Sequence, residues 1–198
     1  MIEFDSAVDE NLRVYEALLK KWQKTINLVS PSTLSSAWQR HFLDSAQLHA
    51  LLKPEYRTVV DIGSGGGFPG LVLAMMASSK AFHLVESDAR KCEFLRTVVR
   101  ETQLKNVFIH TQRFESFDEV IVPDLITARA LADLSQLFSY VMPWTDQNPK
   151  LEMVFMKGRR YAEEIDNARK LYKFECDVIS SSTESDSAIL KINSLTTL

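Results

Sequence analysis

Apolar side chains recur at intervals of three and four along the first fifty residues. One such stripe runs through 5–26 and contains Leu12, Tyr15, Leu19, Trp22 and Ile26. A second runs through 32–52 and contains Leu34, Trp38, Phe42 and Leu48. Residues at this spacing share one face of an α-helix. The pattern therefore predicts two helices, with a capping box at Ser6 and Asp9 and a break that ends at Pro31.

From residue 58 onward, short apolar runs alternate with helical patterns. We predict strands at 58–62, 81–85, 106–110, 125–128, 152–156, 174–180 and 188–193, and helices at 71–76, 91–102, 131–141 and 161–172. This alternation is typical of an α/β, doubly wound, mostly parallel sheet. The short polar connection between the last two runs allows a hairpin, and so one antiparallel strand at the sheet edge. We expect an N-terminal helical extension at 1–54 and one compact unit at 55–198.

Composition restricts the class of protein further. The 198 residues carry a formal net charge of −3 and are 45% hydrophobic, which is ordinary for a globular chain. Cys92 and Cys176 lie far apart, without the spacing of a zinc site or a disulfide framework, so we expect no metal and a reducing compartment. The acidic N-terminus does not look like a signal peptide, and no apolar stretch reaches the roughly 18 residues of a membrane span. We expect a cytoplasmic protein.

A glycine cluster between the first strand and the next helix is the strongest local signal. It reads Asp61-Ile62-Gly63-Ser64-Gly65-Gly66-Gly67-Phe68-Pro69-Gly70. No Lys follows in the position that a P-loop requires, which excludes that motif. The literal GxGxxG at 65–70 fits a dinucleotide site, and a tight turn without ligand is the plain alternative. The carboxylate of Asp61 would repel a pyrophosphate but attract the sulfonium and ammonium groups of S-adenosylmethionine, which favours the latter.

Glu86 ends the second predicted strand. A carboxylate at that place can accept hydrogen bonds from both hydroxyls of a ribose. Because NAD sites use the same arrangement, Glu86 indicates a ribose without deciding which cofactor carries it. An exposed glutamate at a strand end is the alternative.

Several segments together resemble one family. They are Trp22-x4-Asn27-Leu28-x-Ser30, Arg40-His41-x2-Asp44-Ser45, the glycine cluster, Arg113-Phe114-Glu115, Asp124-Leu125-Ile126-Thr127-Ala128-Arg129-Ala130 and Lys157-Gly158. In this order, over roughly residues 12 to 160, the chain resembles the RsmG (GidB) family of bacterial methyltransferases, which modify guanine N7 in 16S rRNA. The resemblance implies a Rossmann-like methyltransferase sheet, S-adenosyl-L-methionine as cofactor, and 16S rRNA or the small ribosomal subunit as partner.

The resemblance also assigns roles to residues. It implies that Asp61, Gly63, Gly65, Phe68 and Glu86 bind the cofactor. Phe114 and Glu115 would lie beside its adenine, although Phe114 could also be ordinary core. Arg129 would face both the cofactor and the target base, with a surface ion pair to Asp124 or Asp133 as the alternative.

The resemblance also implies that His41 and Lys157 are catalytic, but it leaves the role of each residue open. His41 would form a wall of the catalytic cleft or, with Asp44, a hydrogen-bonded clamp that docks the extension. Lys157 would contact RNA, or would be a solvated lysine at a strand end. One segment departs from the family, because Ser185-Asp186-Ser187 stands where members often carry an Arg-His pair.

The expected chemistry follows from the structure of the target nucleobase. Guanine N7 carries a lone pair and no hydrogen, so its methylation requires no general base, and none stands out in the sequence. Basic stretches at 11–41, 90–113 and 150–173 are candidates for RNA contact. We expect a monomer. The alternatives are a methyltransferase for a small molecule or protein, a dinucleotide-dependent oxidoreductase, and a non-catalytic nucleotide-binding module.

Overall fold

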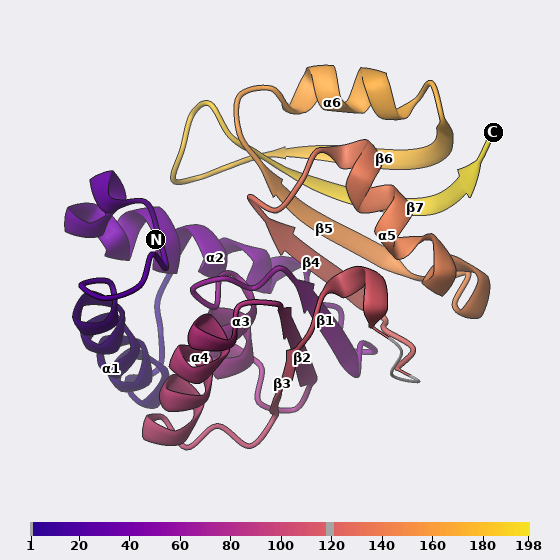
Figure 1. Ribbon diagram of the computed structural model, residues 1–198. Helices are drawn as coiled ribbons and strands as arrows, with labels where there is room; N and C mark the ends of the chain where they lie inside the picture. Colours follow the sequence, from indigo (N-terminus) through magenta and orange to yellow (C-terminus); the bar gives the residue numbers. More distant parts are fainter. Residues whose placement is uncertain (1, 118–120) are drawn as a thin grey trace.

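The computed structural model describes residues 2–117 and 121–198, and a seven-stranded sheet forms its centre (Figure 1). The strands are β1 Thr58–Ile62, β2 Ala81–Glu86, β3 Val107–Thr111, β4 Leu125–Arg129, β5 Glu152–Lys157, β6 Tyr172–Ser180 and β7 Ala188–Thr197. They lie in the order β3-β2-β1-β4-β5-β7-β6, and the pairs among β1 to β5 are parallel. The predicted doubly wound, mostly parallel α/β sheet is confirmed.

The antiparallel strand is β7, and it lies inside the sheet. It pairs with β5 on one side and β6 on the other, so β6 forms the edge. The prediction that the antiparallel strand lies at the sheet edge was therefore wrong: this strand is second from the edge. The side chains of Ala188, Ile189 and Leu190 are all buried, whereas β6 alternates between half-buried and exposed positions. A strand that is apolar on both faces is stable only between two neighbours, which explains the order.

Helices cover both faces of the sheet. They are α1 Ser6–Trp22, α2 Asp44–Ala46, α3 Gly70–Met76, α4 Ala89–Glu101, α5 Leu134–Gln147 and α6 Tyr161–Ala168. Because neighbouring residues of a strand point to opposite faces, Val59 joins a core with α1, α3 and α4, while Val60 joins a core with α5 and α6. Figure 1 shows α5 and α6 on the side of the sheet away from α1.

Aspartates fix where three helices begin. Asp5 accepts a hydrogen bond from Val8 N, so it caps α1 in place of the predicted Ser6. Asp88 caps α4 and Asp133 caps α5 in the same way. The cap at Asp133 moves the start of α5 past the predicted residue 131 and leaves a short loop after β4.

The segment predicted as one helix over 32–52 is helical but irregular. It contains the 3₁₀-helix η1 Pro31–Ser36, the π-helix η2 Trp38–Leu43, the α-helix α2 and the 3₁₀-helix η3 Gln47–Leu51. Apolar spacing alone does not distinguish these three kinds of helix. The π-helix buries His41 and Phe42, and such turns are frequent at functional sites.

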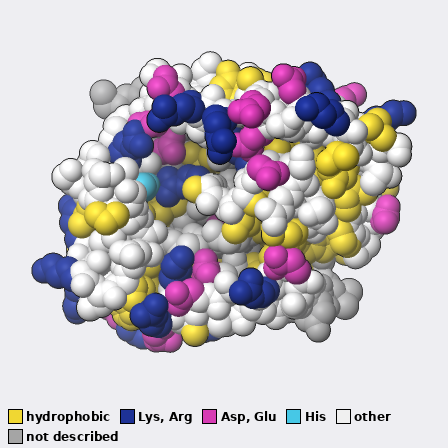
Figure 2. Space-filling model, turned by 45° about the horizontal axis from the view of Figure 1, so that its top comes forward, with side chains coloured by type: hydrophobic (Ala, Val, Ile, Leu, Met, Phe, Trp, Pro, Cys, Tyr) yellow, Lys and Arg dark blue, Asp and Glu magenta, His cyan; other side chains and the backbone are white. Residues whose placement is uncertain are grey.

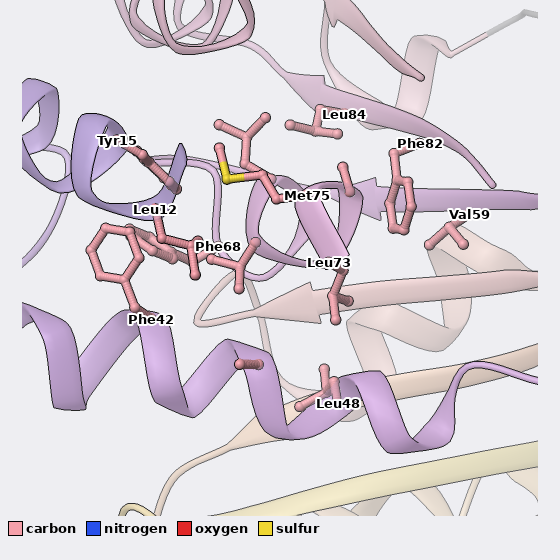
Figure 3. Close-up of a cluster of buried hydrophobic side chains, with 14 of the residues drawn as sticks. Leu12, Tyr15, Phe42, Leu48, Val59, Phe68, Leu73, Met75, Phe82 and Leu84 are labelled. Carbon is pink, nitrogen blue, oxygen red and sulfur yellow. The ribbon is translucent and has the colours of Figure 1, made fainter. Parts of the chain in front are cut away.

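The N-terminal helices share their core with the sheet. Tyr15 of α1 stacks on Phe68 with 5.2 Å between ring centroids, and Phe42 meets Tyr15 edge-on at 4.9 Å (Figure 3). Phe94 of α4 lies 6.1 Å from the Tyr15 ring. Residues 1–54 and 55–198 therefore contribute to one continuous hydrophobic cluster. In the part of the chain that the structure describes, no helix is long and apolar enough to cross a membrane.

Candidate active site

A cavity of about 1020 Å³ opens at the carboxyl ends of the parallel strands. Open α/β sheets bind their ligands at this edge. Figure 2 shows basic and acidic side chains around a hollow on this face. We divide its lining into two named parts. The part predicted to hold the cofactor is called the cofactor half and contains Gly63, Ser64, Gly65, Gly66, Val85, Glu86, Gln112, Phe114 and Glu115. The part predicted to receive the substrate is called the substrate half and contains Arg40, His41, Asp44, Arg129, Lys157, Glu164, Ser181 and Glu184.

The glycine loop between β1 and α3 has a conformation that only glycine adopts without strain. Gly63 and Gly67 have φ of 65° and 91°. A Cβ at Gly67 would lie 2.6 Å from both Leu71 Cδ1 and the Tyr15 hydroxyl, and one at Gly63 would lie 2.5 Å from Leu131 Cδ1. The loop is therefore closely packed on both sides, and its backbone lines the cavity at 63–66.

Glu86 lies in the cofactor half, at the end of β2, and is 8% exposed. One carboxylate oxygen, Oε2, accepts from Gly65 N at 2.9 Å, and the other accepts from Asp88 N at 2.8 Å. A carboxylate oxygen has two lone pairs, so each keeps capacity for a further donor. Glu86 therefore fixes the glycine loop and remains placed for its predicted contact with a ribose.

Asp61 lies beneath the glycine loop and is 1% exposed. Its Oδ1 accepts from Thr127 Oγ1 at 2.7 Å, and Ser64 Oγ donates to its backbone carbonyl at 2.9 Å. Burial raises the pKa of the carboxyl to about 6, against the opposing effect of these hydrogen bonds. Asp61 is not among the residues that line the cavity and supports the loop from below, so its direct contact with the cofactor stays a prediction.

Phe114 and Glu115 belong to the short 3₁₀-helix η4 Phe114–Ser116 and line the cofactor half, as predicted. The ring of Phe114 lies 5.2 Å from Trp144 and 5.6 Å from Tyr140, both on α5. Phe114 therefore packs on the core beneath α5 and also lines the cavity, and its contact with an adenine stays a prediction.

Arg129, at the end of β4, lies where the two halves meet. Its guanidinium carbon is 4.9 Å from the centre of the Phe68 ring, and its Nη1 is 3.6 Å from Asp44 Oδ2. Burial lowers the pKa of the guanidinium, and Asp44 opposes that shift. The alternative of a surface ion pair with Asp124 or Asp133 is wrong. Asp124 instead accepts from the backbone at 57 and 58, and Asp133 caps α5.

His41 lines the cavity, but its hydrogen bond goes to Thr33 and not to Asp44, so the clamp between these two residues is not formed and the catalytic role of His41 stays a prediction. Its ring lies 5.2 Å from Phe68 and lines the cavity, while its Nε2 is 2.8 Å from Thr33 Oγ1. Burial, together with the charges of Arg129 and Arg40, lowers the pKa of the imidazole to about 3. His41 is therefore neutral at physiological pH. The other predicted member of the clamp, Asp44, binds the loop between β6 and β7.

Lys157, at the end of β5, is only 8% exposed. Its Nζ donates to Glu164 Oε2 at 2.7 Å and to the Ala132 carbonyl at 2.5 Å. The alternative of a solvated lysine is therefore wrong. Its predicted contact with RNA stays a prediction, since the ammonium faces the cavity but is already paired.

Some site residues lay outside the predictions. Tyr15 donates from its hydroxyl to the Gly66 carbonyl, but in the sequence it looks like any apolar position of α1. Glu164 and Glu184 line the substrate half without a motif that marks them. The segment 27–31 also lines the cavity, and part of it had been noted as Asn27-Leu28-x-Ser30 without a role.

Comparison with known proteins identifies the group to which these features belong. The family model GidB, described as rRNA small subunit methyltransferase G, matches residues 8–190. A protein of Parvibaculum lavamentivorans named ribosomal RNA small subunit methyltransferase G is 42% identical over 190 residues, covering 94% of this chain and 83% of its own. A protein of the same name from Sinorhizobium medicae is 44% identical over 191 residues, covering 94% and 89%.

Solved structures share the fold at low identity. An O-methyltransferase from Bacillus cereus in complex with SAH has a TM-score of 0.60 and 16% identity, and the match covers 98% of this chain and 93% of that one. MtNAS in complex with MTA and tNA has a TM-score of 0.64 and 18% identity, covering 95% and 74%. The sequence comparisons decide the family: this chain belongs to the GidB family, rRNA small subunit methyltransferase G.

Proposed function

We propose that this protein transfers a methyl group from S-adenosylmethionine to N7 of a guanine in 16S rRNA. The observation that carries the proposal is the division of one cavity into two unlike halves. One half is made of a glycine loop and a strand-end carboxylate. The other is lined by arginine, lysine and histidine together with acids that are already paired. Its volume of about 1020 Å³ lies at the upper end of small-molecule pockets, which leaves room for a cofactor and a base together.

The cofactor half fits S-adenosylmethionine. Gly63 and Gly65 expose backbone without side chains, and Glu86 keeps lone pairs for ribose hydroxyls. Phe114 offers an apolar surface for an adenine, with Glu115 beside it. When bound, S-adenosylmethionine supplies an electrophilic methyl carbon on a sulfonium. No phosphate has to be accommodated above the buried acid Asp61, which argues against a dinucleotide.

The substrate half contains no free base among the residues that the structure describes. Asp44 is paired with Arg129, Glu164 with Lys157 and Glu184 with Arg40. His41 is neutral, but its pKa of about 3 makes it a very weak base. This arrangement suits guanine N7, from which no proton has to be removed. What remains for the protein is to orient the base, an effect that supplies several kcal/mol of rate enhancement.

The cysteines lie away from the cavity lining. Cys92 donates from its thiol to the Glu86 carbonyl and is buried, and Cys176 lies on β6. Methylation of pyrimidine C5 requires a cysteine nucleophile beside the substrate. The position of both thiols therefore argues against C5 of a pyrimidine as the acceptor.

Each basic stretch of the sequence contributes to the cavity. Arg40 comes from 11–41, Lys91 and Arg113 from 90–113, and Lys157 from 150–173. Their convergence supports an RNA substrate, whose target base must be unstacked to enter. The expectation of a monomer stays a prediction.

The experiment is methyl transfer to small ribosomal subunits from a strain without this protein. With labelled S-adenosylmethionine, the purified enzyme should label the rRNA, and the label should map to 7-methylguanosine. Subunits from a strain that contains the protein are the matched control and should accept no further label. Label on a pyrimidine or on an exocyclic amine would contradict the proposal, as would binding of NAD without binding of S-adenosylmethionine.

A further inference from the structure

The cations of the substrate half are all neutralised by acids. Arg40 pairs with Glu184, Arg129 Nη1 lies 3.6 Å from Asp44 Oδ2, and Lys157 Nζ lies 2.7 Å from Glu164 Oε2. A half with three such pairs has no local excess of positive charge to hold a phosphate. It instead offers polar groups that can bind the edge of an uncharged ring.

The three acids differ in how much bonding capacity remains. Asp44 Oδ1 already accepts from Thr183 and from Gln47 Nε2, at 2.8 Å for the latter. Glu164 Oε2 accepts from Leu134 N at 3.0 Å as well as from its lysine. Within residues 2–117 and 121–198, the carboxylate of Glu184 has Arg40 as its one partner, and its side chain is 26% exposed. Glu184 Oε2 and Glu164 Oε1 therefore both keep free acceptors, and Glu184 is the one carried by the β6–β7 loop.

The loop that carries Glu184 is held in place by the helices of the N-terminal segment. Gln47 Oε1 accepts from both Ser182 N and Ser182 Oγ, at 2.9 and 3.1 Å. Ser181 Oγ donates to Asp44 Oδ1 at 3.3 Å, and Thr183 Oγ1 donates to the same oxygen. These bonds fix the residues directly before Glu184, so its carboxylate stays at the rim of the cavity.

The position of Glu184 also suits one side of a purine. The cofactor half lies over β1 and β2, and the β6–β7 loop lies beyond β4 and β5 in the strand order. A guanine whose N7 faces the cofactor half points its Watson–Crick edge the other way. That edge carries the N1–H and N2–H donors, which match the two oxygens of a carboxylate.

We infer that Glu184 selects guanine by accepting hydrogen bonds from its N1–H and N2–H groups. This inference rests on the proposed function. Adenine presents a lone pair at N1, which a carboxylate repels, so the same contact rejects adenine. Arg40 stays bonded to Glu184 Oε1, and the remaining lone pairs of Oε1 and Oε2 accept the two donors.

The test compares guanosine with inosine, which lacks only the N2 amino group. Small-subunit rRNA is ligated from fragments so that either nucleoside occupies the position mapped above, and it is assembled into small subunits before the assay. The wild-type protein should lose about tenfold in kcat/KM on the inosine RNA, the size expected for half of a two-point contact. Glu184→Ala should be slower on guanosine and should treat both RNAs nearly alike, while Glu184→Gln, which keeps one acceptor, should fall between.

Asp186→Ala is the matched control, because it removes an acid from the same loop. It should keep the wild-type preference for guanosine over inosine. Undiminished preference in Glu184→Ala, or no preference in the wild-type protein, would overturn the inference. A wild-type protein that fails to methylate even the guanosine RNA would instead refute the proposed function. Glu184→Ala with lower activity but the full preference would mean that Glu184 only anchors Arg40, which also overturns the inference.

Discussion

The hydroxyl of Tyr15 connects α1 to the glycine loop, and its removal tests how far the loop depends on the N-terminal helices. Tyr15 is fully buried and donates to the Gly66 carbonyl. Tyr15→Phe deletes that donor while the ring keeps its stacking on Phe68 at 5.2 Å. The change therefore isolates one hydrogen bond from the surrounding apolar packing.

The expected loss of free energy follows from the carbonyl that Tyr15→Phe leaves buried without a donor. The Gly66 carbonyl would stay buried against Tyr15 and Leu28 without its donor, and a buried acceptor without a partner costs about 1–3 kcal/mol. Some of this loss should appear in the free energy of unfolding. The rest should appear as weaker binding of S-adenosylmethionine, because Gly65 and Gly66 line the cofactor half. A loss of 1.4 kcal/mol in binding is tenfold in Kd.

Denaturant unfolding and calorimetric titration with S-adenosylmethionine measure the two quantities. Tyr172→Phe is the matched control, since it removes a hydroxyl from a ring that packs on Phe138, on the other face of the sheet. The control should change neither quantity by more than about 0.5 kcal/mol. If Tyr15→Phe has the unfolding free energy and the Kd of the wild-type protein, the glycine loop does not depend on α1, and the reasoning is refuted.

Three further changes address the loop and the buried titratable groups. Gly67→Ala should cost about 2–5 kcal/mol of unfolding free energy, because the residue has a φ of 91° and its new Cβ would lie 2.6 Å from two atoms. Gly158→Ala is the control and should change stability little, because its Cβ would have no atom within 4 Å. Asp61 has a raised pKa of about 6, so its ionisation opposes folding. As pH rises from 4 to 7, the wild-type protein should lose up to about 3 kcal/mol of unfolding free energy relative to Asp61→Asn. A difference in unfolding free energy that stays constant with pH would contradict this. His41 has a lowered pKa of about 3, so the wild-type protein should lose about 2 kcal/mol relative to His41→Asn as pH falls from 7 to 5, measured by denaturant unfolding at each pH.

The sheet was predictable from the sequence because its signals are local. Runs such as Thr58–Ile62 and Glu152–Lys157 are mostly apolar and almost wholly buried, and helical patterns separate them. The order of the last two strands was harder to predict. The sequence pattern of a hairpin is the same whichever of its two strands lies inside the sheet. The decisive difference is that Ala188–Leu190 is continuously apolar, while Tyr172–Ser180 alternates. That contrast is visible in the sequence, because a continuously apolar run suits an inner strand and an alternating run suits an edge strand.

Charge pairing in the cavity was not predictable, because the partners come from distant segments. Arg40 and Glu184 lie on η2 and on the β6–β7 loop, and Lys157 meets Glu164 across the start of α6. Each of these cations suggested RNA contact when considered alone. Their neutralisation depends on the fold, because the fold brings each cation to an acid from another segment of the chain.

The glycine motif likewise indicated a ligand but not what holds its shape. Asp61 is predicted to contact the cofactor because its carboxylate would attract a sulfonium or ammonium group, and the structure places it below the loop, beside Gly70. Above, the loop is limited by Leu28, whose carbonyl would lie 3.0 Å from a Cβ on Gly66, and by the Tyr15 hydroxyl. Both of these come from the first thirty residues. Because the loop is held between a buried strand end and the N-terminal segment, we expect substitutions at the buried positions of that segment to alter cofactor binding as well as folding.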